Sequence, residues 1–486
     1  MESRIWLDVT TTLNWNRPAV GIIRAESECA LYLISTNFPH IRFCRFDLQS
    51  KQYLEVDPID VQRALDKIRQ GRIPDDPPAP PSSPTPAVPS AEQRIKHTVF
   101  RVINSMPKKL RQRVHRFATK RSVAFYAAMR SYYEFRLAIR EFISPSIFSA
   151  PVPTETEQSK SNQQPKSPFI SGDVYISLGL DWDDKDYEYL FSEKKRINFK
   201  VLLFCYDLIP VKYPHLFFAD VASRFAHYFA DLAWCADKVL CISECTRRDL
   251  TELLKELGGP VPPMSVIKLG CNIPQFNNQK PTPEILEIAE KRFILFVSTI
   301  ERRKNHEVLY RAYTRLVDNG IKNLPSLVFV GMPGWGVDEL LSDLQLDVRT
   351  KPYIRILNHV SDLDLQYLYQ HAIFTVFPSL YEGWGIPVAE SLANGKFCLT
   401  SNTASMPEVG EDFVEYIDPW DLPSWVERLK WYFNHPEEVL LKEQRIRSEY
   451  RPTPWNETAF LVLKHAQELR AVSSLASEGK SVLVLS

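Results

Sequence analysis

The sequence predicts an α/β protein with two doubly wound units, each a parallel sheet with helices on both faces. Short apolar runs alternate with segments of helical length from Asp173 onward, and the same rhythm restarts after 284. Continuous apolar runs of this kind are typical of strands buried on both faces of a parallel sheet. The chain has 486 residues, too many for one ordinary domain. Ligands of such folds bind beyond the carboxyl ends of the strands, so we expect a site where the two units face each other.

The first unit is expected over 1–273, with an insertion at 51–171. Residues 1–50 have the pattern of a strand, a Thr-rich loop, a helix and a second strand. After the insertion, strands are expected at 173–177, 199–206 and 238–242, and helices at 219–235 and 246–256.

The insertion differs in composition from the rest of the chain. Residues 74–89 contain eight prolines and are expected to be a linker. Residues 94–140 carry thirteen Lys or Arg and one acid, Glu134, with helical spacing. Two interpretations of this basic segment stay open: it docks on anionic lipid, or it packs on the first unit with a solvated basic face.

The second unit is expected over 284–460, and 461–486 are expected to form a C-terminal helix and tail. Its predicted strands are 293–297, 327–331, 354–357, 374–377 and 397–400, and its predicted helices are 305–319, 336–346, 362–371 and 387–394.

Composition narrows the function classes. Lys and Arg balance Asp and Glu at 59 each, so the total charge gives no support to a nucleic-acid role. The eight cysteines form no CxxC pair and most lie in apolar runs, as expected of buried thiols in a reducing compartment. We see no apolar secretory leader and no run of about 20 apolar residues. We therefore expect a cytoplasmic protein, with peripheral contact to the inner face of the membrane as a further option.

The most informative motif is Tyr381-Glu382-Gly383-Trp384-Gly385-Ile386-Pro387, followed by Glu390. It comes after an apolar strand and leads into a helix, with Pro387 suited to the first turn. Free N–H groups at such a turn bind anions such as a pyrophosphate. Glu382 and Glu390 are then expected to hold hydroxyl groups on either side of that pyrophosphate.

A second motif, Ser298 to Asn305, also lies between a strand and a helix. Arg303 supplies a planar fork and Lys304 a point charge, the pair expected around a diphosphate leaving group. Fixed cations stabilise the charge that builds on that group.

Weaker candidates come from the remaining strand ends. Asp207 follows a strand of the first unit, and Gly21 lies in a loop that can face the site. Gly331 either lies near a nucleotide or ends its strand, and backbone groups at Val360 can meet a base edge. Two DxD strings, at Asp181 and Asp362, raise the question of a metal, which their helical context disfavours.

With these motifs in order along the chain, the sequence resembles glycosyltransferase family 4, the retaining group with the GT-B fold of two Rossmann-like domains. The resemblance covers 1–50 and about 172–460. Besides the two motifs above, it rests on Ser405 to Gly410, Asp418-Pro419, Tyr206 to Pro210, Ser243 to Thr246 and Leu269-Gly270. Bacterial mannosyl- and rhamnosyl-type transferases of surface polysaccharides are the most similar members.

The resemblance implies roles for individual residues. Arg303 and Lys304 would bind the donor diphosphate, Glu382 the sugar hydroxyls and Glu390 the ribose. Backbone amides of Trp384, Gly385 and Ile386 would assist. The reaction would retain anomeric configuration, need no metal or other cofactor, and pass the acceptor proton to the leaving diphosphate.

The expected function is therefore transfer of a hexose, such as mannose from GDP-mannose, to a glycan or polyprenyl-linked acceptor in surface polysaccharide synthesis. One departure from the family pattern is Tyr206, which stands where many members carry a His before the Asp. Asp207 is therefore only a candidate for a catalytic role. Two alternatives are a glycoside hydrolase with a carboxylate pair and a non-catalytic sugar-binding protein on a transferase fold.

Overall fold

The computed structural model describes residues 2–16, 19, 21–36, 38–70, 167–217, 221–271, 280–321, 323–334 and 336–477. Residues 1–73 and 167–486 form one compact unit, which contains two parallel sheets. The predicted Pro-rich segment 74–89 and basic segment 94–140 lie outside the described residues.

The first sheet has seven strands in the order β3-β2-β1-β4-β5-β6-β7, and only the β2–β3 pair is antiparallel. Its strands are β1 (Ile5–Asp8), β2 (Ile41–Asp47), β3 (Gln52–Val56), β4 (Val174–Ser177), β5 (Lys200–Cys205), β6 (Lys238–Cys241) and β7 (Met264–Val266). Its helices are α1 (Thr10–Asn14), α2 (Gly21–Ser35), α3 (Pro58–Gln70), α6 (Asp181–Asp184), α7 (Tyr187–Ile197), α8 (Ile209–Lys212), the 3₁₀ helix η1 (Pro214–Leu216), α9 (Val221–Cys235) and α10 (Glu244–Glu256).

The second sheet has six strands, all parallel, in the order β10-β9-β8-β11-β12-β13. They are β8 (Phe293–Val297), β9 (Ser326–Val330), β10 (Ile354–Leu357), β11 (Thr375–Phe377), β12 (Cys398–Ser401) and β13 (Glu415–Ile417). The helices are α11 (Pro283–Ala289), the 3₁₀ helix η2 (Arg302–Lys304), α12 (His306–Asp318), α13 (Asp338–Leu346), α14 (Asp362–His371), α15 (Ile386–Ala393), α16 (Met406–Gly410), α17 (Leu422–Asn434) and α18 (Pro436–Glu449). The last helix, α19 (Trp455–Ser477), packs on the first sheet.

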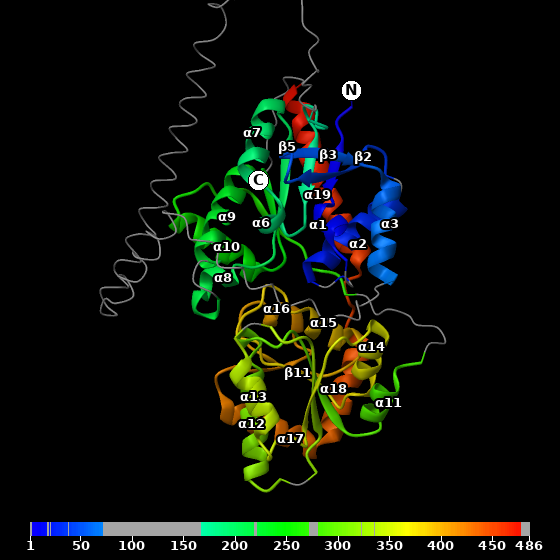
Figure 1. Cartoon of the computed structure of the whole chain (residues 1–486), viewed down its shortest axis with the longest axis vertical. Helices are drawn as coiled ribbons and strands as arrows, with labels where there is room; N and C mark the ends of the chain where they lie inside the picture. Colours follow the sequence, from blue (N-terminus) through cyan, green and yellow to red (C-terminus); the bar gives the residue numbers. More distant parts are fainter. Residues whose placement is uncertain are drawn as a thin grey trace, which may run out of the picture. The chain divides into compact units, whose positions relative to one another are not determined.

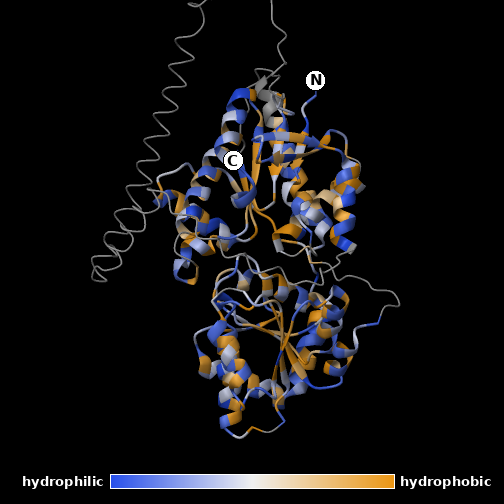
Figure 2. Ribbon diagram, in the orientation of Figure 1, coloured by the Kyte–Doolittle hydropathy of each residue, from blue (hydrophilic) through white to orange (hydrophobic). Residues whose placement is uncertain are grey.

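Both sheets are covered by helices on their two faces, as the apolar strand sequences predicted. In the first sheet, Figure 1 shows α2 and α3 on one side and α7, α9 and α10 on the other. Ile5 and Leu7 of β1 pack in one buried cluster and Trp6 in another, because successive strand side chains point to opposite faces. Figure 2 shows the hydrophobic residues concentrated on the strands of both sheets. The prediction of two doubly wound α/β units is confirmed.

Two boundaries differ from the prediction. The insertion was expected to begin at residue 51, but 52–70 form β3 and α3, with Tyr53 and Leu65 in the buried core. The compact unit instead extends as far as residue 73 and resumes at 167. The C-terminal helix was expected from 461, but α19 begins at Trp455 and packs against α2. Within the described ranges, none of the helices combines the length and apolar character needed to cross a bilayer.

Candidate functional site

The loop after β11 carries Glu382 and ends at α15. Gly385, just before the helix, has φ 127°, a conformation that side chains with a Cβ disfavour. A Cβ on Gly383 would lie 2.1 Å from the backbone oxygen of Tyr206 and 2.9 Å from Cβ of Asp207. The loop therefore passes directly against the segment after β5 of the first sheet, which only glycine at position 383 permits.

Glu382 lies in a buried cluster with both cations of the second motif. Its carboxylate is 2.5 Å from Nη1 of Arg303 and 2.6 Å from Nζ of Lys304. The hydroxyl of Ser379 donates to the same carboxylate at 2.6 Å. Burial alone would raise the pKa of Glu382, but the two cations outweigh it and lower that pKa to about 2. Glu382 is therefore ionised at neutral pH.

The pKa values of Arg303 and Lys304 shift in opposite directions in this cluster. Burial tends to lower the pKa of Arg303, but Glu382 and Glu301 raise it well above its ordinary value. The pKa of Lys304 is lowered, first by burial and then by Arg303, although Glu382 opposes the shift. Arg303 also donates to the oxygen of Tyr381 at 2.9 Å. The Arg side chain is thus the fixed charge of the pair, and it holds the Glu382 loop in place.

Local backbone geometry presents these cations at the end of β8. Asn305 adopts the left-handed conformation (φ 59°) between η2 and α12, which turns the chain sharply after Lys304. Its amide donates to the oxygens of Pro378 and Pro419, at 3.2 and 2.9 Å. Asn305 therefore ties the cation motif after β8 to the loops after β11 and β13.

Asp207 is brought to the same place by the first sheet. Burial raises the pKa of its carboxyl, while Arg303 and the N–H of Ile209 lower it and Glu382 raises it further. The Ile209 N–H donates to Asp207 at 3.0 Å, so the carboxylate also caps the start of α8. The structure thus places Asp207 beside the Glu382 cluster, where it also accepts a hydrogen bond in the turn before α8.

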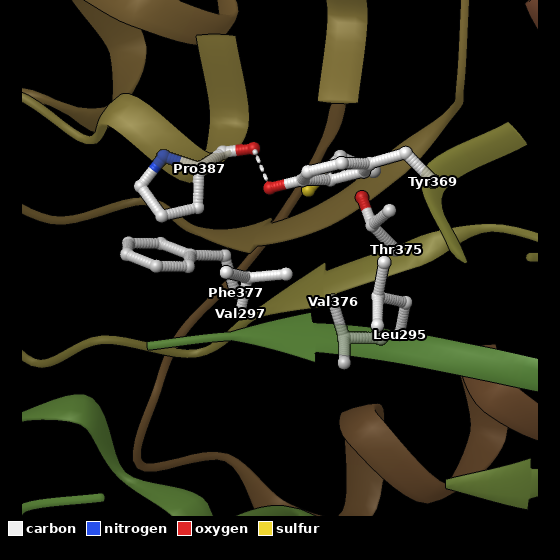
Figure 3. Close-up of a pocket in the computed structure, with 8 residues that line it drawn as sticks. Leu295, Val297, Tyr369, Thr375, Val376, Phe377 and Pro387 are labelled. Atoms are coloured by element: carbon white, nitrogen blue, oxygen red, sulfur yellow. Dashed lines mark hydrogen bonds between the residues drawn. The ribbon is translucent and has the colours of Figure 1, made fainter. Parts of the chain in front are cut away.

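Glu390 occupies a separate position, one helical turn into α15. Its carboxylate accepts a hydrogen bond of 3.0 Å from the hydroxyl of Tyr369 in α14. Burial raises the pKa of Glu390, and Arg24 of α2 is near enough to lower it. The hydroxyl of Tyr369 also reaches the oxygen of Pro387 at 3.5 Å, as Figure 3 shows.

Figure 3 shows the small pocket beside this tyrosine, between β8, β11 and α15. Its lining is mostly apolar: Leu295, Val297, Tyr369, Thr375, Val376, Phe377, Pro387 and Cys398. These residues belong to the buried core of the second sheet, so the pocket is a packing feature behind Glu390 rather than a polar ligand site.

The remaining predicted residues fall into different surroundings. Gly21 begins α2 with φ 51°, and a Cβ there would meet open space. A Cβ on Gly331 would lie 2.0 Å from the oxygen of Ser298, so this glycine lets two strand ends approach each other. Val360 is half-buried against the core of the second sheet. Trp384 is buried, and its backbone oxygen accepts from Ser405 at 2.6 Å.

The two DxD strings have structural partners, and so does His306, which follows the cation motif. Asp181 pairs with Lys185 at 2.7 Å and accepts from Ser177 at 2.6 Å. Asp364 accepts from the N–H of Thr282 at 2.8 Å. His306 opens α12 with its ring 4.3 Å from that of Phe296, and burial lowers its pKa to about 3. Among the described residues, no three His, Cys, Asp or Glu side chains gather as metal ligands.

Sequence reasoning missed several partners of the site. Ser379, Tyr369 and Arg24 contact or influence the two glutamates from different elements. Ser379 stands three residues before Glu382, a spacing that hints at a turn contact. The other two could not be found from spacing, because they come from α14 and α2.

Comparisons with known proteins support the family. Residues 278–449 match the family model described as "Glycosyl transferases group 1". An O-antigen chain mannosyltransferase B of Escherichia coli is 32% identical over 191 residues, 38% of this chain and 49% of that protein. A serotype-specific mannosyltransferase WbdA of Escherichia coli is 24% identical over 273 residues, 54% of this chain and 32% of that protein. The chain thus spans half or less of the length of these relatives.

A solved structure supports the fold over nearly the whole chain. The sucrose-phosphate synthase of Thermosynechococcus elongatus superposes with a TM-score of 0.55 at 15% identity, covering 97% of this chain and 100% of that one. A likeness at this level of identity speaks for the fold alone. The two sheets form the GT-B fold, and residues 278–449 are similar to the group 1 glycosyl transferases, in line with the resemblance to glycosyltransferase family 4.

Proposed function

We propose that this protein is a retaining glycosyltransferase that moves a hexose from a nucleotide-diphosphate sugar to a glycan or polyprenyl-linked acceptor. The observation that carries the proposal is the Glu382 cluster, in which one ionised carboxylate and two fixed cations meet at the carboxyl ends of parallel strands. Mannose as the sugar, with GDP-mannose as the donor, is supported by the two relatives, an O-antigen chain mannosyltransferase and a serotype-specific mannosyltransferase.

The chemistry follows from the charges. The bond between the sugar anomeric carbon and the diphosphate breaks, and a bond from that carbon to an acceptor hydroxyl forms on the same face. Arg303 and Lys304 stabilise the negative charge that develops on the leaving diphosphate. The acceptor proton passes to a diphosphate oxygen, so this route requires neither a metal nor a protein base. Both cations already contact Glu382, so a bound diphosphate shares them with that carboxylate.

The two glutamates then serve as binding groups. Glu382 stays ionised and is within reach of the sugar next to the diphosphate, where it accepts hydrogen bonds from sugar hydroxyls. Glu390 lies at the other end of the loop and the first helical turn, where it accepts from ribose hydroxyls. The N–H groups of Trp384, Gly385 and Ile386 face the anion between them.

A carboxylate-pair hydrolase fits the geometry less well. Such enzymes place both carboxyl groups across one scissile bond. Here Glu382 is directed to η2 and Glu390 to Tyr369 of α14. A hydrolase also has no diphosphate leaving group, so Arg303 and Lys304 would have no developing negative charge to stabilise.

The test is a thermal-shift screen of the full chain against GDP, UDP, dTDP and ADP, followed by turnover of the matching nucleotide sugar. We expect GDP to raise the melting temperature most and Glu382→Ala to reduce turnover by orders of magnitude while the fold persists. Sugar release from a glycan without a nucleotide diphosphate would establish the hydrolase instead. Unchanged turnover in Glu382→Ala would refute the assignment of the site.

A further inference from the structure

The short helix α16 is joined to the Glu382 loop by hydrogen bonds at its start. The hydroxyl of Ser405, which directly precedes α16, donates to the backbone oxygens of Glu382 at 2.9 Å and Trp384 at 2.6 Å. Ser405 is fully buried, so neither bond is exposed to solvent. The position of α16 and the position of the Glu382 loop are therefore linked.

The same helix reaches the first sheet through Glu408. Its two carboxylate oxygens accept hydrogen bonds from the backbone N–H groups of Glu244, at 2.6 Å, and Cys245, at 2.8 Å. These N–H groups lie in the first turn of α10, where helical N–H groups have no partner within the helix and the helix dipole favours an anion. Hydrogen bonds to an ionised acceptor are about twice as strong as neutral ones. We call this the α16–α10 contact.

Further contacts lie around the α16–α10 contact and join α10 to the segments that carry Asp207 and Glu382. The hydroxyl of Thr246 donates to the oxygen of Tyr206 at 3.2 Å and lies 3.5 Å from that of Gly383. The thiol of Cys245 lies 3.4 Å from the hydroxyl of Tyr381. The first turn of α10 thus touches the residue before Asp207 on one side and both neighbours of Glu382 on the other.

From this arrangement we infer that Glu408 is a positioning residue for transfer, which holds the Glu382 loop of the second sheet against the Asp207 segment of the first. It acts through α10 and touches neither substrate. The inference rests on the proposed function for its effect on turnover, but not for its effect on structure. Loss of the α16–α10 contact separates Asp207 from Glu382 and leaves Arg303 and Lys304 where they are.

Cys245 reports directly on this contact. Its side chain is 3% exposed and is covered by Tyr381 of the second sheet. Burial raises the pKa of the Cys245 thiol to about 11, so it reacts slowly with alkylating reagents while the contact holds. Cys29 of α2 and Cys398 of β12 are buried in the hydrophobic core and serve as internal references for global unfolding.

The experiment compares Glu408→Gln with Glu411→Gln in the full chain. Glu411 is the matched control: it lies just after α16 and pairs with Lys268 at 2.9 Å, but both side chains are about half exposed. Iodoacetamide labelling of each cysteine is followed by peptide mass spectrometry. We expect Cys245 to react at least about tenfold faster in Glu408→Gln and at the wild-type rate in Glu411→Gln, with Cys29 and Cys398 unreactive in both.

Turnover gives the second readout, with GDP-mannose as the donor and release of GDP as the signal. We expect kcat to fall about tenfold in Glu408→Gln while binding of GDP is unchanged. An unchanged Cys245 rate, or the same increase in Glu411→Gln, overturns the inference. Equal exposure of all three cysteines also overturns it, because Glu408 would then support the whole fold. If the wild-type protein binds none of GDP, UDP, dTDP and ADP, the proposed function fails, and the labelling result still decides the role of Glu408.

Should Glu408→Gln prove too unstable to purify, Glu408→Asp replaces it. This variant keeps the charge but shortens the side chain by one methylene, so its carboxylate no longer spans both N–H groups. We expect the same selective gain in Cys245 labelling, and a wild-type rate in this variant overturns the inference as well.

Discussion

Replacing Glu382 by Gln removes the one negative charge that contacts both Arg303 and Lys304. The three side chains are only 10%, 15% and 13% exposed, so water compensates the two cations poorly. The drop in the pKa of Glu382 from 4.5 to about 2 corresponds to roughly 3 kcal/mol of folding free energy at neutral pH. Removal of one partner from a buried ion pair costs about 3–5 kcal/mol, which agrees with that figure.

The sign of the pH dependence follows from the direction of the shift. Because the pKa of Glu382 is lower in the folded protein than in the unfolded chain, its contribution is complete above the ordinary value of 4.5. It is lost as the pH falls from there through about 2. Glu382→Gln should therefore be destabilised at neutral pH, and its stability should approach that of the wild type in acid.

Thermal unfolding at pH 7 and pH 3 measures both effects. We expect Glu382→Gln to melt roughly 4–6 °C below the wild type at pH 7, with a smaller difference at pH 3. The matched control is Glu307→Gln, which removes an exposed glutamate paired with Arg311 on the surface of α12, and should change the melting temperature by about 1 °C or less. Equal melting temperatures of Glu382→Gln and wild type at pH 7 would refute the ion-cluster reasoning.

Two further predictions concern other parts of the chain. Gly383→Ala places a Cβ 2.1 Å from the oxygen of Tyr206, so we expect turnover to fall at least tenfold while GDP binding, measured by calorimetry, persists; normal turnover would contradict the close approach. For the basic segment 94–140, the lipid-docking interpretation predicts that its deletion abolishes flotation of the protein with anionic liposomes, and equal flotation of both forms would reject that interpretation.

Much of the fold could be predicted because local signals, such as helix caps and apolar strands, agreed with the alternation of strands and helices along the chain. The helix expected at 362–371 is α14, since Ser361 caps it by accepting from the N–H of Asp364. The edge strand β3 was assigned to the insertion instead. Its sequence, Gln52–Val56, mixes polar and apolar residues and pairs antiparallel with β2, unlike the apolar parallel strands elsewhere. The edge strand β13 (Glu415–Ile417) was missed because it has three residues and begins with a charged one.

The site was predictable where its residues follow neighbouring strands of one sheet. It was not predictable where tertiary packing brings residues in from other elements. Glu382, Arg303 and Lys304 follow strands β11 and β8, which are neighbours in the sheet, so their meeting follows from topology. Tyr369 of α14 donates to Glu390 and Arg24 of α2 acts on its charge, and neither relation leaves a trace in sequence spacing.

The opposite pKa shifts of the two glutamates require an argument, because an acid–base pair shows the same pattern. The pKa of Glu382 is lowered by two cations, and that of Glu390 is raised by burial. An acid–base pair must act on one bond, yet the partners of these carboxylates lie on η2 and on α14. Glu382 also titrates near pH 2, too far from neutrality for proton transfer to be efficient. The shifts therefore follow from two separate binding environments on one loop and helix, and turnover between pH 5 and pH 8 should not depend on the titration of Glu382.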